Sequence, residues 1–476
     1  MQIELIGVVA FLIGLISLGR SPGFSVYMVF LSTLLGASAA AILTALGGAS
    51  LQPAHLMLAF VLLKVGTNPY RLADGLSSLS FPRPGFWLLI TVLYALAGAV
   101  LITRLFAGST NVYSIARLGD GVRIALVPLV PTTGNVTQSL YFASDLLAYV
   151  AFYACSKELG SRSLAVLCSA AVVCAFANFA FGLIDVATYL TGTGELLSFL
   201  RNAGYTMLVE VEMAGFKRVV GSFSEASTYG SASLFLFTFT GKMWLEEVYT
   251  RRAGLAAAVS LIAVIASTST TAYAGLAIVA TIEYLTCLYS LVINRRSTRN
   301  ATLFLFLGPF VVAFIVMAGA LQESVWNAVQ SIYQAAFSEK LTSDSGVERS
   351  SWNYQGLQNL FETNGLGVGV GSTRTSSWPL AVLASLGVIG TVTYFAFVLL
   401  FLLARPVGDA RTQSFQKSIR LACVTQVVLG SIGSPFVDLG LLFFMCAGVS
   451  MAVTESERSA SVARAQLLER GGVPAE

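Results

Sequence analysis

The sequence predicts an all-α protein, a polytopic bundle of transmembrane helices. Of its 476 residues, 56% are hydrophobic and only 11% are charged, which is too apolar for a soluble protein with a solvated surface. Stretches approaching the ~20 apolar residues that a helix needs to cross a bilayer recur from the first residues almost to the last. No soluble domain, internal repeat or low-complexity segment interrupts them. One membrane domain, residues 1–453, and a short polar tail, 454–476, therefore describe the chain, and the tail is expected to be disordered.

The apolar stretches predict about twelve to fourteen spans. The number is given as a range because the shortest stretches fall below the length that a full span needs. The predicted spans are 3–19, 24–47, 53–68, 86–107, 136–155, 164–190, 227–245, 253–267, 271–293, 301–321, 378–404, 420–433 and 437–453.

Lysine and arginine collect on alternate connections between the spans. Cytoplasmic loops are enriched in these residues, so the basic connections are placed inside. The large loops 191–226 and 322–377 then lie outside. The net charge of +4 reflects this topology and does not indicate nucleic acid. The residues placed inside are Arg71, Arg83, Lys157, Arg162, Arg251, Arg252, the cluster 295–299, Arg405, Arg411, Lys417, Arg420, Arg458, Arg464 and Arg470.

The sequence predicts neither a disulfide framework nor a metal site. All six cysteines fall within spans or at their inner edges, and none is part of a CxxC pair. His55 is the single histidine, which excludes zinc sites built from histidines. The outer loops offer no compact carboxylate cluster for Mg²⁺, so no cofactor is expected.

A first polar island, residues 216–230, ends the outer loop 191–226. It contains Lys217 and Arg218, and Glu225 lies near the start of the following span, where the helix dipole favours a carboxylate. Ser224 or Ser227 is an alternative helix cap. The preceding residues, 196–210, predict a helix on the membrane surface. An ordinary polar cap with snorkelling cations would also explain this island.

A second polar island occupies residues 322–378. Residues 325–337 show helical spacing of apolar side chains, which predicts another surface helix. The run 365–371 has glycine at alternate positions, which permits unusual backbone angles and close approach of a ligand. It is not a P-loop, because no Gly-Lys-Ser/Thr follows it.

Arginine dominates the outer loops. A guanidinium donates two parallel hydrogen bonds to phosphate and keeps its charge when partly desolvated. Arg218, Arg349 and Arg374, with Lys217, are therefore predicted to bind a diphosphate, and Arg117 and Arg123 are weaker candidates. Each arginine alone is equally consistent with a structural salt bridge.

Four carboxylates fall within or beside the predicted spans: Asp145, Asp185, Glu283 and Asp438. Each would cost ~2.5–3.5 kcal/mol at a lipid-facing helix centre, so they should face protein or water. Asp438 is expected nearer the surface. Asp185 and Asn178 could line a substrate cavity or form hydrogen bonds between helices. The hydroxyl run 267–271 is expected to cap a helix or to contact sugar or phosphate.

Four segments occur in an informative order. They are Arg218 with the run 221–230, then 266–275, the glycine run 364–371, and Leu386-Gly-Val-Ile-Gly390. In this order they resemble the superfamily of O-antigen ligases and Wzy-type polysaccharide polymerases over residues 205–405. Arg218 and Gly230 are one residue further apart than in the polymerases' paired motif, and Arg349 has no glycine at that spacing.

The resemblance implies a GT-C-like helical glycosyltransferase in the bacterial inner membrane. Its substrates would be glycans on undecaprenyl diphosphate at the periplasmic face, and its functional residues would be arginines of the two outer loops, here Arg218 and Arg349 or Arg374. The ligases carry a histidine late in the second loop, whereas residues 372–378 contain none. A polymerase is therefore favoured over a ligase.

The expected reaction is an inverting, metal-independent glycosyl transfer from one lipid diphosphate to a sugar hydroxyl on the next lipid-linked unit. Fixed guanidiniums stabilise the departing diphosphate. Glu225 is the predicted base, with Asp344 and Glu348 as substitutes. Membrane lipids and a chain-length regulator or export complex are the expected partners. A transporter of lipid-linked glycan or small anions, or a structural assembly partner, is the alternative from another class.

Overall fold

The computed structural model describes residues 2–44, 48–118, 121–213, 215–295, 297–321 and 344–469. Helices dominate the described chain, as the sequence predicts. They are α1 (Leu5–Leu18), α2 (Pro22–Ser32), α3 (Pro53–Gly66), α4 (Pro69–Ser77), α5 (Pro84–Leu105), α6 (Thr133–Leu159), α7 (Arg162–Leu190), α8 (Ala226–Leu245), α9 (Thr250–Ala266), α10 (Thr270–Val292), α11 (Arg299–Leu321), α13 (Asp344–Glu362), α14 (Trp378–Leu402), α15 (Ala410–Gly433) and α16 (Leu441–Glu469).

Short strands form three small antiparallel sheets. The first has the order β1-β2-β3, and the other two are the pairs β4-β5 and β6-β7. Their bounds are β1 (Gln2–Ile3), β2 (Ala41–Leu43), β3 (Ala49–Leu51), β4 (Asn111–Leu118), β5 (Gly121–Pro128), β6 (Glu212–Met213) and β7 (Phe216–Lys217).

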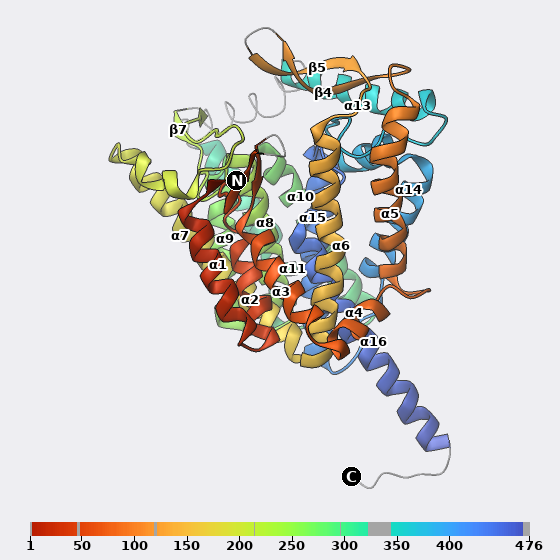
Figure 1. Ribbon diagram of the computed structural model, residues 1–476. Coiled ribbons are helices and arrows are strands. Elements are labelled where there is room, and N and C mark those ends of the chain that lie inside the picture. Colours follow the sequence, from red (N-terminus) through yellow and green to blue (C-terminus); the bar gives the residue numbers. More distant parts are fainter. Residues whose placement is uncertain are drawn as a thin grey trace.

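The long helices lie side by side and give the molecule two ends (Figure 1). The β4-β5 hairpin, α13 and β7 lie at the end drawn at the top, called here the upper end. The end from which α16 projects is called the lower end. Several helices begin with proline, among them α2, α3 and α5, because a first-turn residue needs no amide hydrogen and the fixed φ suits a helix.

Four of the described helices are long and apolar enough to cross a membrane: α5, α7, α10 and α14. Large apolar side chains also stay exposed along other helices. On α11, Phe306, Phe310 and Phe314 are 63%, 72% and 65% exposed, which is unfavourable in water and favourable against lipid tails. The described chain is thus a membrane-embedded helical protein.

The core at the centre of the bundle is aromatic. Tyr394 and Phe397 of α14 stack on Phe444 of α16, and Tyr149 of α6 meets Phe397 edge to face. All four rings are fully buried. Aromatic pairs in these geometries add about 0.5–1.5 kcal/mol each beyond the area they bury. They fix α6, α14 and α16 as a rigid frame for the segments at the upper end.

Cations predicted to share one side do gather at the lower end. Arg71 pairs with Glu158 at 2.5 Å, Arg83 pairs with Glu455 at 2.9 Å, and Lys417 pairs with Glu246 at 2.9 Å. The first polar island and the described part of the second, from residue 344 onward, lie at the other end (Figure 1). Basic residues at one end and polar loops at the other are what we expect if inside and outside connections alternate along the chain.

Most of the predicted spans coincide with helices whose bounds agree within a few residues, but a helix over 24–47 is wrong. Helix α2 ends at Ser32, and the remaining apolar residues turn into β2, which pairs with β3. The predicted surface helix 196–210 is also wrong, because only Gly194–Leu200 forms a short 3₁₀ helix. The tail is helical as far as Glu469, where α16 ends, rather than disordered from residue 454. The predicted helix 325–337 lies outside the described residues.

The glycine run 365–371 forms backbone hydrogen bonds with α14 at the point where that helix is interrupted. Gly387 has φ +60° and interrupts the helix, and the backbone amides of Val368 and Gly369 donate to the carbonyls of Ala384 and Ser385 at 2.9 and 3.0 Å. A Cβ on Gly367 would lie 2.6 Å from the Gly387 nitrogen. Glycine is thus required at this position because another segment of the same backbone approaches it closely, whereas the sequence suggested the approach of a ligand.

Candidate functional site

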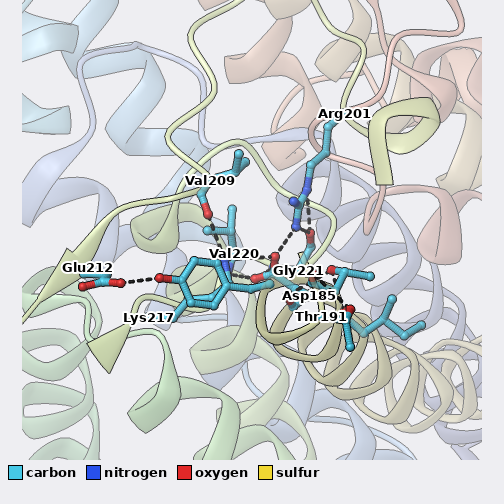
Figure 2. Close-up of polar contacts among 11 residues, drawn as sticks. Asp185, Thr191, Arg201, Val209, Glu212, Lys217, Val220 and Gly221 are labelled. Atoms are coloured by element: carbon cyan, nitrogen blue, oxygen red, sulfur yellow. Dashed lines mark hydrogen bonds and ion pairs between the residues drawn. The ribbon is translucent and has the colours of Figure 1, made fainter. Parts of the chain in front are cut away.

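The loop that carries Arg218 is held by the carboxylate of Asp185, near the end of α7 (Figure 2). Asp185 is 1% exposed, and its Oδ2 accepts hydrogen bonds from the amides of Val220 and Gly221 at 2.8 and 3.2 Å. Its Oδ1 accepts from Arg201 at 2.6 Å and lies 3.3 Å from the Lys217 ammonium. The structure therefore assigns Asp185 to neither of its predicted roles. It fastens the loop to the helix.

The Lys217 ammonium contacts the Asp185 carboxylate and two further groups. Its ammonium donates to the carbonyl of Val209 at 2.8 Å and lies 4.7 Å from the centre of the Tyr189 ring. Figure 2 shows the ammonium directed at Asp185. Lys217 and Arg201 together balance one buried carboxylate, as a buried charge requires. In the described structure, Lys217 is a positioning residue for its neighbour Arg218.

Arg218 itself is half-buried and, among the described residues, has no carboxylate within ion-pair distance. Its Nε donates to Thr268 Oγ1 at 3.2 Å. Burial lowers the pKa of the Arg218 guanidinium, while the charges of Glu225 and Tyr273 act in the opposite direction. A partly desolvated cation whose charge is not matched at close range is suited to an anionic ligand.

Glu225 is the N-cap residue of α8 and is partly buried. Its Oε1 accepts hydrogen bonds from the hydroxyls of Ser227 and Thr228, the latter at 3.3 Å. The charge of this carboxylate raises the pKa of Arg218, but no ion pair or hydrogen bond joins the two side chains in the described structure.

The hydroxyl run 267–271 caps a helix, which is one of the two roles that the sequence allowed it, while contact with sugar or phosphate stays a prediction. Ser269 caps α10, because its Oγ accepts from the Ala272 amide at 3.3 Å. Thr268, at φ +47°, turns its hydroxyl to Arg218. Asn178 donates to Ser233 at 2.8 Å and joins α7 to α8, which confirms a hydrogen bond between helices.

Arg374 is the second half-buried arginine at the upper end without an ion-pair partner among the described residues. Its backbone amide donates to the Tyr113 carbonyl of β4 at 2.8 Å. Its guanidinium lies 5.6 Å from the centre of the Phe436 ring, and its buried Nε has no hydrogen-bond partner in the described structure. Burial lowers the pKa of Arg374.

Two other predicted arginines are exposed, and the side chain of a third, Arg117 of β4, lies outside the described residues. Arg349 lies in the first turns of α13, and Arg123 lies in β5 of the hairpin. Glu348, beside Arg349, is also exposed. These residues share the upper end with Arg218, but no contact within the described chain joins them to it. Asp344 begins α13, and its side chain lies outside the described residues.

Arg218 and Arg374 are linked through the upper ends of α10 and α15. A Cβ on Gly433 would lie 3.6 Å from Cγ2 of Thr271, so these helix ends touch. Thr271 follows the Thr268 turn that binds Arg218, and Gly433 precedes the turn that carries Phe436 beneath Arg374. The elements that carry the partners of Arg218 and Arg374 therefore touch at their ends, while no contact among the described residues joins the two guanidiniums.

Sequence reasoning missed Arg201 and Phe436 as parts of the site. Arg201 follows the 3₁₀ helix, and only the tertiary fold brings it to Asp185. Thr268 is the second residue of the hydroxyl run 267–271, which the sequence did single out. Phe436 carries no signal of its own, since isolated aromatic residues are common in membrane proteins.

The whole chain was compared with known proteins. No protein-family model, curated protein or solved structure matches it. The resemblance described above therefore rests on the order of its motifs alone.

Proposed function

We propose that this protein is an inner-membrane polysaccharide polymerase with twelve to fourteen spans and a GT-C-like architecture. It transfers a growing glycan from undecaprenyl diphosphate to a lipid-linked repeat unit at the periplasmic face. The observation that carries the proposal is the pair of half-buried arginines, Arg218 and Arg374, which have no carboxylate partner among the described residues.

Charge development in the reaction explains why such arginines are useful. As the anomeric carbon leaves its phosphate, negative charge grows on the diphosphate. Preorganised cations stabilise this charge without rearranging, and removing one such donor in other enzymes costs about 2.7–4 kcal/mol. Arg218 is held by Thr268 and by the loop that Asp185 fastens, so its position is fixed before substrate binds.

A carboxylate at the same end takes the proton from the acceptor hydroxyl, which typically accelerates such a step ~10²–10⁴-fold. Glu225 is the residue predicted from sequence. The exposed Arg349 and Arg123 belong to the outer rim in this scheme and attract the anionic substrate at longer range. No metal is needed, because arginines supply the positive charge.

The test uses purified protein, lipid-linked repeat units and EDTA. A ladder of lengthening glycans is the expected product. A single block added to a lipid A core acceptor would make the protein a ligase. Transport-competent vesicles that move lipid-linked glycan without forming any product would favour a transporter.

A further inference from the structure

A hollow of about 800 Å³ opens at the lower end, where α1 turns into α2. The chain's N terminus lies near the upper end, and α1 descends from it to this turn (Figure 1). Ligand pockets typically have volumes of roughly 300–1,000 Å³, so the hollow is large enough for a small molecule or for part of a lipid. It is lined by Ile16, Gly19, Arg20, Ser21 and Phe24.

The apolar part of this hollow continues the lipid-facing stripe of α1. Leu12, Leu15 and Ile16 are 54%, 46% and 54% exposed. They are three or four residues apart, a spacing that places side chains on one face of a helix. Half-buried Phe24 supplies apolar surface from α2. A lipid tail that lies along α1 therefore reaches the hollow over apolar surface alone.

The polar part of the hollow carries positive charge. Arg20 is exposed and takes part in none of the ion pairs of the described residues. Directly behind the turn lies the ammonium of Lys64, from α3, which is 4% exposed. It too has no carboxylate within ion-pair distance in the described part of the chain. Two cations thus lie together at this turn without a matching negative charge.

The buried Lys64 also holds the turn in place. Its ammonium donates to the carbonyls of Ser17 and Arg20 at 2.5 and 2.7 Å, and to Ser25 Oγ at 3.0 Å. These bonds join the end of α1 to the first turns of α2, so the backbone of Arg20 is fixed before any ligand binds. Ser21 is the N-cap residue of α2, and its hydroxyl makes no capping hydrogen bond. The positive end of the α2 dipole adds to the attraction for an anion.

We propose that this hollow binds one anionic phospholipid from the leaflet at the lower end. Its phosphate lies on the Arg20 guanidinium and the Ser21 hydroxyl, and one acyl chain lies against Ile16 and Phe24. A guanidinium donates two parallel hydrogen bonds to a phosphate. Basic pockets between membrane helices are known to bind such head groups. The inference needs only a membrane-embedded protein and does not depend on the proposed function.

The head group determines which lipid is preferred. A zwitterionic phospholipid carries a cation beside its phosphate, and Arg20 and Lys64 repel that cation. An anionic phospholipid such as phosphatidylglycerol carries none. The site should therefore select by charge, whereas the apolar stripe alone would accept both lipids equally.

Native mass spectrometry of the purified protein, titrated with phosphatidylglycerol or with phosphatidylcholine of the same acyl chains, tests the inference. The wild type is expected to bind one phosphatidylglycerol, and Arg20→Gln should raise its Kd roughly 10- to 150-fold. Arg251→Gln is the matched control, since this exposed arginine lies beside the α8–α9 turn at the same end. Equal affinities of the wild type for the two lipids, or an unchanged Kd in Arg20→Gln, would overturn the proposal.

A second variant, Gly19→Leu, separates a shaped site from general attraction of surface charge. A Cβ on Gly19 would lie 3.9 Å from the nearest atom, the Ile16 carbonyl oxygen, so leucine enters the hollow without strain and leaves both cations in place. Binding of phosphatidylglycerol should weaken by about tenfold or more, with an unchanged melting temperature. Wild-type affinity in Gly19→Leu would show that the hollow holds no lipid. Displacement of the lipid by inorganic phosphate would instead make this a site for the free anion, and the proposal would fall.

Discussion

Replacing Asp185 by alanine should release the loop that presents Arg218. The substitution removes a 1% exposed carboxylate that accepts from the Val220 and Gly221 amides and balances Arg201 and Lys217. These cations are themselves only 9% and 8% exposed, so they would be left buried without a counter-charge. Breaking such a pair costs about 3–5 kcal/mol.

Hydrogen exchange measures this effect locally. A loss of 3 kcal/mol in the free energy of opening corresponds to roughly a hundredfold faster exchange, so the Val220 and Gly221 amides should exchange at least that much faster in Asp185→Ala. Glu195→Gln, an exposed change in the same outer loop, is the control and should leave exchange unaltered. Exchange in Asp185→Ala within about threefold of wild type would refute the reasoning, since the loop would then be held by other contacts.

Three further predictions concern the chemistry and the packing. Arg218→Lys should fold normally and lose about 10- to 100-fold in polymerisation rate, because lysine cannot donate two parallel hydrogen bonds to phosphate; wild-type turnover would remove the argument for arginine. Gly371→Ala should destabilise the protein by at least ~3 kcal/mol, since its Cβ would lie 2.3 Å from the Gly134 carbonyl oxygen at φ +81°. Gly48→Ala, at φ +84° in open space, should cost only about 1–2 kcal/mol, and equal unfolding free energies for the two variants would contradict the packing account. Burial raises the pKa of Glu246, but Lys242 and Lys417 lower it more, so its net pKa is below the ordinary value. The stabilisation is therefore present above the pKa of the unfolded chain and is lost as pH falls through the folded value; the melting temperature should drop between about pH 5 and pH 3, and less steeply in Glu246→Gln.

Hydropathy was enough to predict the long helices because an apolar helix satisfies its backbone hydrogen bonds internally and needs no partner element to form. It failed at 24–47. An apolar run shows only that residues are buried or lipid-facing, and Ala41–Leu43 is a strand paired with β3 in which Ala41 is buried and the other two residues are half-buried. The β4-β5 hairpin was missed because its pairing depends on a turn and on contacts with α13, which are not local properties of the sequence.

The same distinction between local sequence features and tertiary contacts applies to the candidate site. The composition of the first island was enough to predict that Arg218 and Glu225 lie together, because they are seven residues apart on one loop. The roles of Asp185 and of the glycine run depend on tertiary contacts, with Val220 in one case and with the break at Gly387 in the other. Arg349 and Arg374 are indistinguishable as sequence, yet one is exposed and the other rests on Phe436.

Binding of undecaprenyl diphosphate to the purified protein tests the central claim most directly. Each charge-assisted hydrogen-bonding group contributes about 1.5–3 kcal/mol, so Arg218→Ala and Arg374→Ala should each raise the Kd roughly 10- to 150-fold. Arg104→Ala, an exposed arginine at the upper end of α5, is the matched control and should bind as the wild type does. Unchanged affinity in both Arg218→Ala and Arg374→Ala would contradict the account, because these two cations would then have no part in holding the phosphate.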